Sequence, residues 1–155
     1  MSAHMDTKVG MSHSNWLGVV SRSHLSQTEG AESWWCLPHT AAPGDRILFY
    51  CPRSLSAEKQ GIFSEAEVLS SPSPTRAENC NCATYGTTRL HYVEIRIIEC
   101  FARSLTAAQM KQNVALSRSE PVRKNFQGTA FKLETRIFEQ MKSALTALKL
   151  TSSKV

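Results

Sequence analysis

The sequence predicts an α+β fold in which several strands form a curled, barrel-like sheet flanked by a few helices. Apolar runs typical of strands outnumber helical patterns, and their spacing does not match a repeated strand–helix–strand unit. A chain of 155 residues with 41% hydrophobic residues is long and apolar enough to bury one core. Two neighbouring tryptophans, Trp34 and Trp35, precede a Pro-Gly-Asp turn, as in a small barrel with an aromatic pocket at its mouth.

The first half of the chain predicts two strands and a short helical turn. Residues 16–21 are a compact apolar run, typical of a buried strand. Ser23 is placed to cap a helical turn that extends to Gln27. Residues 46–51 are rich in strand formers and follow a turn in which Pro43 and Gly44 occupy the turn positions. We therefore expect a strand, a helical turn and a second strand.

The middle of the chain predicts two more strands separated by a long loop. Residues 62–69 form the first of these, and we expect three inward side chains: Phe63, Ala66 and Val68. Residues 70–83 contain two prolines with Ser and Asn, which predicts the longest loop. Residues 90–101 alternate between apolar and charged side chains, which predicts a long, half-exposed strand.

The C-terminal part predicts two helices with a strand between them. Thr106 and Gln109 have the spacing of a capping box, which opens a short helix through Asn113. Residues 129–133 fit a final strand. From Glu134 onward, apolar side chains recur at helical spacing and predict an amphipathic helix: Ile137, Phe138, Met141, Leu145 and Leu148. The expected organisation is a disordered leader over 1–14, one domain over 15–148 and a frayed tail over 149–155.

Charge and cysteine content narrow the class of protein. The chain carries 18 Lys and Arg against 13 Asp and Glu, a net charge of +5 that permits a polyanionic partner without requiring one. No apolar run approaches the roughly 20 residues of a membrane helix, and the polar N-terminal stretch lacks the apolar core of a secretory signal. Five scattered cysteines, an odd number, favour a reduced, cytoplasmic protein.

Three segments carry a resemblance to a known family. They are WLGVVSRSHL at 16–25, then PGDRILFYCPR at 43–53 followed by GIFSEAEV at 61–68, and finally RKNFQG at 123–128 followed by FKL at 131–133. In this order and spacing they resemble the EVE domain, a PUA-like family related to the YTH readers of methylated adenine. The resemblance covers about residues 16–138. It implies a PUA-like curled β-barrel with short flanking helices and a C-terminal amphipathic helix.

The resemblance also implies a function. EVE-like domains are non-enzymatic modules that bind nucleic acid, DNA or RNA, by reading a modified or flipped nucleobase of the methylated cytosine or adenine type. It implies that the module acts alone or beside a partner nuclease or NTPase, and we expect a monomer. Two departures concern the ligand. Phe126 stands where the family often has Trp, and Trp35-Cys36 is similar to the tryptophan–cysteine pair of the YTH readers.

The tryptophan pair is the main candidate for the base pocket. Neighbours on a strand point to opposite faces, so we expect one ring in the core and one at a surface or pocket, with simple core or rim packing as the alternative. The resemblance favours Trp35 as the ring that lines the pocket. Stacking a base on such a ring contributes about 1–3 kcal/mol. The full expected pocket is Trp34, Trp35, Cys36, Ser21, Tyr85, Asn125 and Phe126. The expected phosphate contacts, for which solvated surface charge is the alternative, are Arg22, Arg123, Lys124 and Lys132.

Other functions have weaker support. A PUA-like pocket for a small molecule, without a nucleic-acid role, stays open. Cys36 with His39 as its base would need a third orienting group, which the sequence does not supply. Cys80 and Cys82 near His91 form one tight pair without the second pair of a strong zinc site, so we expect no metal and no cofactor.

One pair of carboxylates also belongs with these weaker candidates. Glu65 and Glu67 share a strand face, as the period of two requires, and we expect that face to be solvated. Paired carboxylates can act as general acid and base, but no catalytic partner lies near them in the sequence. We therefore expect no catalytic group in this chain.

Overall fold

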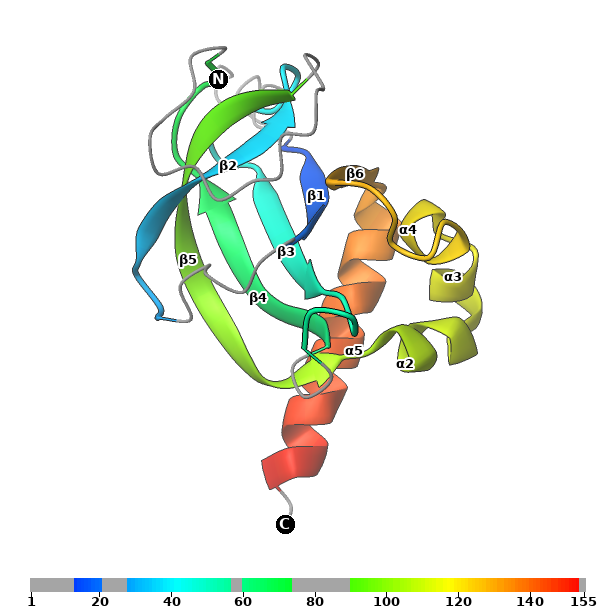
Figure 1. The fold of residues 1–155 in the computed structure, drawn as a ribbon. Helices are drawn as coiled ribbons and strands as arrows, with labels where there is room; N and C mark the ends of the chain where they lie inside the picture. Colours follow the sequence, from blue (N-terminus) through cyan, green and yellow to red (C-terminus); the bar gives the residue numbers. More distant parts are fainter. Residues whose placement is uncertain (1–12, 21–27, 57–59, 74–89, 154–155) are drawn as a thin grey trace, which may run out of the picture.

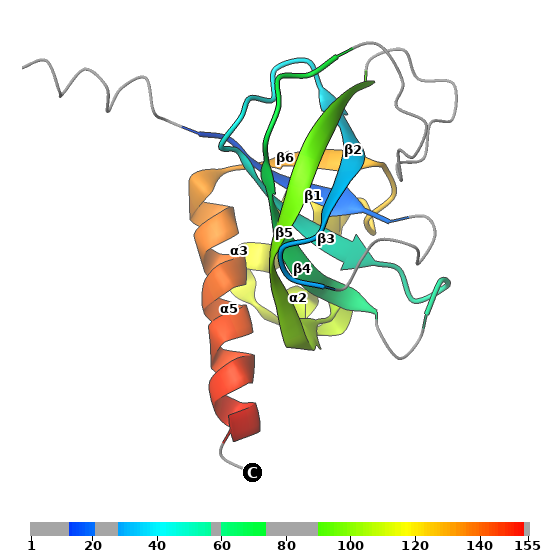
Figure 2. The ribbon, with the colours of Figure 1, turned by 90° about the vertical axis from the view of Figure 1, so that its left-hand side faces the viewer.

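The fold is known from a computed structural model, which describes residues 13–20, 28–56, 60–73 and 90–153. Six strands form one mixed sheet in the order β2-β5-β4-β3-β1-β6, and the sheet curls into a half-barrel (Figure 1). The helices gather on one side of it, with the long α5 running along the sheet (Figure 2). This arrangement confirms the predicted α+β class.

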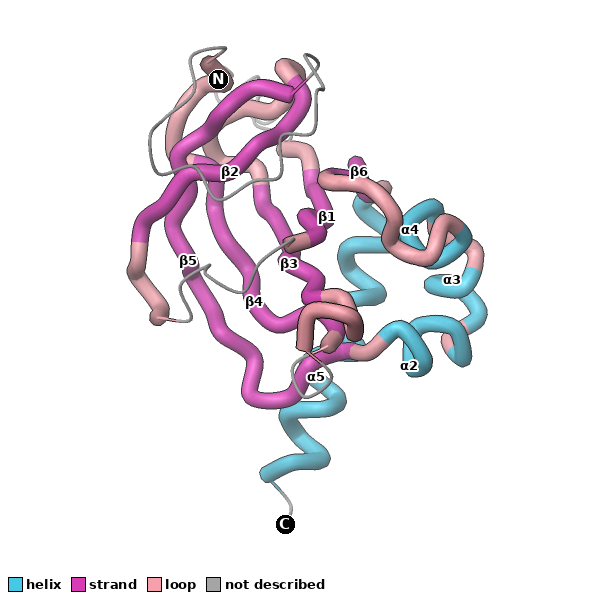
Figure 3. Tube along the Cα trace, in the orientation of Figure 1, coloured by secondary structure: helices cyan, strands magenta, loops and turns pink. Residues whose placement is uncertain are grey.

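The elements follow the chain in a simple order. Figure 3 shows how the strands and helices segregate in space. The strands are β1 (Asn15–Val19), β2 (Glu32–Pro38), β3 (Arg46–Cys51), β4 (Gly61–Val68), β5 (Leu90–Leu105) and β6 (Ala130–Leu133). The helices are α2 (Ala107–Gln112), α3 (Val114–Ser117), α4 (Glu120–Arg123) and α5 (Thr135–Ser153). The pair β1–β3 is parallel, and the other strand pairs are antiparallel.

Both faces of the central strands are buried, which explains their nearly continuous apolar runs. On β3, Ile47 and Phe49 face the interior of the half-barrel, where Trp35 also lies. Their neighbours Leu48 and Tyr50 face the opposite side and pack under the helices. The predicted inward residues of β4, Phe63, Ala66 and Val68, all belong to the half-barrel interior.

The Pro-Gly-Asp turn ties the starts of β1 and β3 together. The Asp45 side chain is 2% exposed. Its Oδ1 accepts a hydrogen bond from the Ser14 amide at 2.9 Å, and its Oδ2 accepts from Trp16 Nε1 at 2.9 Å and from the Ala42 amide at 3.0 Å. Gly44 has a φ of +95°, a conformation that glycine adopts without strain. The turn thus fixes where the parallel pair begins.

The expectation of a solvated face at Glu65 is wrong. Glu65 is 1% exposed, and its carboxylate accepts hydrogen bonds from Arg46 Nη1 at 3.1 Å and from Lys142 Nζ of α5. A buried carboxylate needs such partners because an unpaired charge in the interior is costly. Glu67 is only half-buried and pairs with Arg96 at 3.3 Å.

Several expected boundaries agree with the structure, and some elements run longer. The capping box of Thr106 and Gln109 is present in both directions at the start of α2. Strand β5 continues to Leu105, beyond the expected end at residue 101. Helix α5 continues to Ser153, into the segment expected to be a frayed tail. The expected helical turn at 23–27 and residues 1–12 of the expected leader over 1–14 lie outside the described residues.

Candidate functional site

Trp35 lies at the centre of the half-barrel interior. Its side chain is fully buried, and its ring meets the Phe49 ring edge to face, with centroids 4.9 Å apart at 78°. Gly18 of β1 leaves room for this pair, since a Cβ built at Gly18 would lie 3.0 Å from Trp35 Nε1 and 3.1 Å from the Phe49 ring. Three strands therefore close around one indole ring.

The indole N–H of Trp35 is a buried donor without a hydrogen-bond partner among the described residues. An unsatisfied buried donor costs about 1–3 kcal/mol, so native proteins rarely keep one. An acceptor on a ligand that reached this atom would recover that cost. The atom is thus the chemically distinctive point of the half-barrel interior.

Trp34 has the opposite orientation. It pairs with Glu94 across the β2–β5 ladder and is half-buried, whereas its neighbour Trp35 has no exposed surface. This is the division that strand alternation predicted, with one ring in the core and one that keeps surface. Trp34 is therefore the member of the pair whose ring keeps accessible surface outside the core.

Cys36 follows the tryptophan pair and is fully buried. Its sulfur takes part in a disulfide bond, which differs from the reduced cysteine expected from the sequence. A disulfide sulfur is not a thiolate, and the thiolate is the nucleophile in cysteine catalysis. The idea of an enzyme acting through Cys36 and His39 therefore gains no support from the structure.

Phe126 and Asn125 lie in the helical layer rather than beside Trp35. The Phe126 ring stacks on Tyr50, with centroids 3.8 Å apart at 6°, and both belong to the core under the helices. Asn125 is exposed, and its φ of 51° with the 57° of Phe126 forms a tight left-handed turn. Tyr50 points away from the half-barrel interior because it follows Phe49 on β3. The predicted pocket residues thus fall on two faces of the sheet.

Two titratable side chains in the sheet have raised pKa values. Burial raises the pKa of Tyr50, and the adjacent Cys51 thiolate adds to the effect. Burial also raises the pKa of the Cys100 thiol, helped by the negative charges of Glu29 and Glu99. Neither residue is placed as an acid or base near Trp35, and Cys100 becomes a poorer nucleophile because its thiolate is disfavoured.

The remaining predicted site residues are only partly described. Ser21, Arg22 and Tyr85 lie outside the described residues. Lys124 is exposed and pairs with Glu120 at 2.9 Å. The base-pocket and phosphate-contact roles of all these residues stay predictions.

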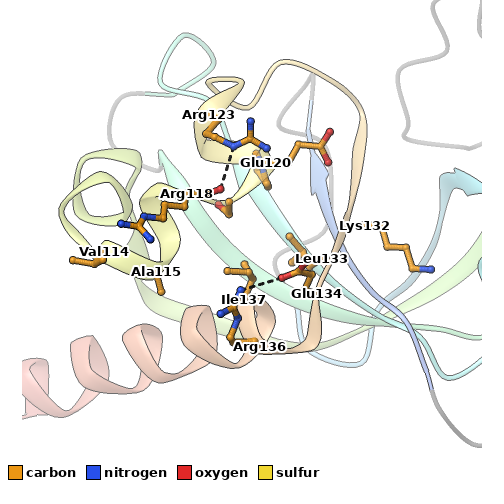
Figure 4. A pocket seen from close by; sticks show the side chains of 12 residues that line it. Val114, Ala115, Arg118, Glu120, Arg123, Lys132, Leu133, Glu134, Arg136 and Ile137 are labelled. Carbon is orange, nitrogen blue, oxygen red and sulfur yellow. Dashed lines mark hydrogen bonds and ion pairs between the residues drawn. The ribbon is translucent and has the colours of Figure 1, made fainter.

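A groove lies between the short helices and the start of α5, with a volume of about 720 Å³. Figure 4 shows Arg118 and Arg123 on the helical wall, Arg136 and Glu134 at the start of α5, and Lys132 extending from β6 away from the helices. The full lining is Val114, Ala115, Arg118, Ser119, Glu120, Pro121, Arg123, Lys132, Leu133, Glu134, Arg136 and Ile137. Two predicted phosphate contacts, Arg123 and Lys132, thus both line the groove, although the Lys132 side chain extends away from the helices, and two further cations of the lining, Arg118 and Arg136, were not predicted from the sequence.

The described part of the chain offers neither a metal cluster nor a membrane-spanning helix. There, no group of three or more His, Cys, Asp or Glu side chains is arranged to hold a metal ion. The His39 and His91 rings lie near each other, with centroids 6.0 Å apart, whereas Cys80 and Cys82 are outside the described residues. Within the same ranges, every helix is too short or too polar to cross a lipid bilayer.

The curled six-stranded sheet with its C-terminal helix defines a small PUA-like α+β module. The particular family follows from the sequence. The chain belongs to the EVE domain family, whose profile matches residues 14–144. No curated protein sequence matched the chain.

Solved structures of low sequence identity share the fold. A protein from Pseudomonas putida is 20% identical, with a TM-score of 0.63 over 84% of this chain and 98% of its own. A hypothetical protein from Leishmania major is 12% identical, with a TM-score of 0.65 over 89% and 98% of the two chains. Human THYN1, solved in complex with DNA containing 5-methylcytosine, is 12% identical, with a TM-score of 0.56 over 85% and 97%.

Proposed function

We propose that this protein is a binding module, not an enzyme, that recognises a modified base in DNA. The observation that carries the proposal is membership of the EVE domain family together with a fold like that of human THYN1, which was solved with DNA containing 5-methylcytosine. The net charge of +5 is compatible with a polyanionic ligand.

The tryptophan pair supports the proposal physically. Trp35 offers an indole N–H, unpartnered among the described residues, in the half-barrel interior, and Trp34, on the opposite face of β2, offers a half-buried ring for stacking as the alternative site. Extracting a base from a duplex costs a few kcal/mol, which stacking and edge hydrogen bonds must offset. A methyl group buried in such a pocket adds about 0.8 kcal/mol, so the pocket favours a methylated base. Ser21, Cys36 and Tyr85 are proposed to complete this pocket, whereas Asn125 and Phe126 lie in the helical layer on the other face of the sheet and are left out of it.

Recognition also needs contacts to the backbone of the nucleic acid. Arg22, Arg123, Lys124 and Lys132 are the proposed phosphate contacts, which position the strand without reading its sequence. Arg123 and Lys132 gain support from their shared groove. RNA is the alternative ligand to DNA. We also propose that the protein is monomeric and cytoplasmic and acts alone or beside a partner nuclease or NTPase.

The proposal is tested by fluorescence anisotropy with matched DNA and RNA oligonucleotides. Each set carries one 5-methylcytosine, 5-hydroxymethylcytosine, N6-methyladenine or unmodified base, at two salt concentrations. We expect tightest binding to one modified DNA and weaker binding at higher salt. Equal affinity for modified and unmodified oligonucleotides would refute a modified-base reader. Salt-independent, weak binding throughout would favour the small-molecule pocket instead.

Variants of the tryptophan pair locate the pocket. Trp34→Ala removes a half-buried ring, and we expect affinity for the preferred oligonucleotide to fall about 5- to 150-fold, equivalent to 1–3 kcal/mol of stacking. Trp35→Phe keeps an aromatic ring in the core but removes the indole N–H and part of the ring volume, whereas Trp35→Ala would remove nearly all of the core packing. Leu150→Ala, at an exposed position of α5, is the control. Unchanged affinity in both tryptophan variants would place the pocket elsewhere.

A further inference from the structure

Three cationic side chains that line the groove have no carboxylate partner among the described residues. The two carboxylates that also line it are each paired with another base: Glu120 with Lys124 at 2.9 Å, and Glu134 with Arg136 at 3.4 Å. The ion pairs of the described residues do not include Arg118, Arg123 or Lys132. The groove therefore carries uncompensated positive charge at Arg118 and Arg123, and Lys132 adds a third charge at its edge, where its side chain extends away from the helices (Figure 4).

These cations come from three separate elements. Arg118 follows α3, Arg123 ends α4, and Lys132 lies on the edge strand β6. The Nε of Arg123 donates to the Arg118 carbonyl oxygen at 3.1 Å, which holds the two arginines beside each other (Figure 4). The positive charge thus extends from the helices to the edge of the sheet.

The edge strand connects this groove to the tryptophan site. Lys132 is paired with Trp16 across the β6–β1 ladder, and its ammonium lies 6.0 Å from the centroid of the Trp16 ring. Two residues earlier on β6, Ala130 is paired with Gly18, the residue that contacts Trp35. At about 3.4 Å per strand residue, Lys132 and Ala130 lie about 7 Å apart along β6. A bound strand that followed this edge would pass from the groove towards the tryptophan site.

We infer that the groove binds the phosphates of the DNA strand that flanks the recognised base. This inference rests on the proposed function. Phosphate oxygens suit guanidinium and ammonium donors, and arginine is well shaped to hold them through two parallel hydrogen bonds. Arg118, Arg123 and Lys132 are all exposed, so their charged groups are free to meet an anion from solution. Strand β6 leads from the groove, beside β1, towards Gly18 and the tryptophan site, so one nucleic-acid strand could occupy both places, which favours it over an acidic peptide.

The salt dependence of DNA binding tests the inference. The variant Arg118→Gln/Arg123→Gln/Lys132→Gln removes the three unpaired cations. Each phosphate contact to duplex DNA contributes about 0.9 to the slope of log K against log salt, so we expect the slope to fall by about 2–3. The preference for the modified base should be unchanged, because phosphate contacts carry no base information.

A matched variant separates the groove from net charge. Arg103→Gln/Lys111→Gln/Lys149→Gln removes the same charge from exposed positions that do not line the groove. We expect its slope to stay within about one contact of the wild type. The groove assignment would be overturned if both variants had the same slope, or if the groove variant kept the wild-type slope. In either case the proposed binding of a modified base would be unaffected. A wild-type protein that bound no DNA would overturn both proposals. Thermal unfolding of each variant confirms that it folds.

Discussion

We predict that the carboxylate of Asp45 contributes strongly to the stability of the fold, because it accepts three hydrogen bonds at the turn. Asp45→Asn keeps the shape of the side chain but replaces one acceptor oxygen with an NH₂ donor. If the new amide oxygen faces Trp16 Nε1 and the Ala42 amide, the NH₂ group faces the Ser14 amide, and the hydrogen bond to Ser14 is lost. If the amide is turned over, the hydrogen bonds to Trp16 and Ala42 are lost instead. At least one hydrogen bond is therefore lost in either orientation.

The size of the effect follows from these contacts. A hydrogen bond to a charged group contributes about 1.5–3 kcal/mol and one between neutral groups about 0.5–1.5 kcal/mol. One bond is lost and two become neutral, while the removal of a buried charge offsets part of the change. We expect Asp45→Asn to lower the free energy of unfolding by about 2–4 kcal/mol. That is a large share of the roughly 5–15 kcal/mol of a typical domain.

Urea denaturation followed by tryptophan fluorescence measures this change. The control is Glu139→Gln, the same chemical change at an exposed position of α5, which should alter stability by less than about 0.5 kcal/mol. A double-mutant cycle with Trp16→Phe isolates the bond to the indole, and we expect a coupling energy above about 0.5 kcal/mol. If Asp45→Asn matched the control, the turn would not depend on this carboxylate.

Three further predictions concern the sheet. Gly18→Ala would press a methyl group against the buried Trp35 ring and should destabilise the fold by about 1–3 kcal/mol in urea; full stability would show that the ring can move aside. Because burial raises the folded-state pKa of Tyr50, stability should be constant below the unfolded pKa of about 10 and fall as pH rises from there. Urea midpoints between pH 9 and 11 should show a smaller fall for Tyr50→Phe, and parallel curves would contradict this. Glu65→Ala should lower the free energy of unfolding by about 2–4 kcal/mol in the same assay, because two cations lose their buried partner. Glu67→Ala should lower it by less than about 1 kcal/mol, and equal losses in the two variants would argue against the buried network.

Features with a local cause were predictable from the sequence. Strand β3 and helix α5 repeat their apolar residues with periods that follow from backbone geometry alone. The capping box of α2 needs only two residues at the right spacing. Helices α3 and α4, at four residues each, are too short to show a period, so the sequence does not predict them.

Features that depend on docking between distant segments were not predictable. Glu65 looks solvated until α5 places Lys142 against it. Phe126 was assigned to a pocket by resemblance, but resemblance gives a position in the chain and not the face of the sheet on which a ring packs. Arg118 belongs to the groove only because α3 folds back towards β6 and α5, an arrangement with no local signature in the sequence.

The position of β1 between β3 and β6 has a consequence for how the chain folds. The first strand obtains its second neighbour from near the other end of the chain, since Asn15 is paired with Leu133. Contacts between such distant residues form slowly because a long loop must close first. During synthesis, β1 can pair with β3 early, yet its other edge stays open until the ribosome has released β6. Truncation before Ala130 would leave that edge exposed and ready to pair with another chain.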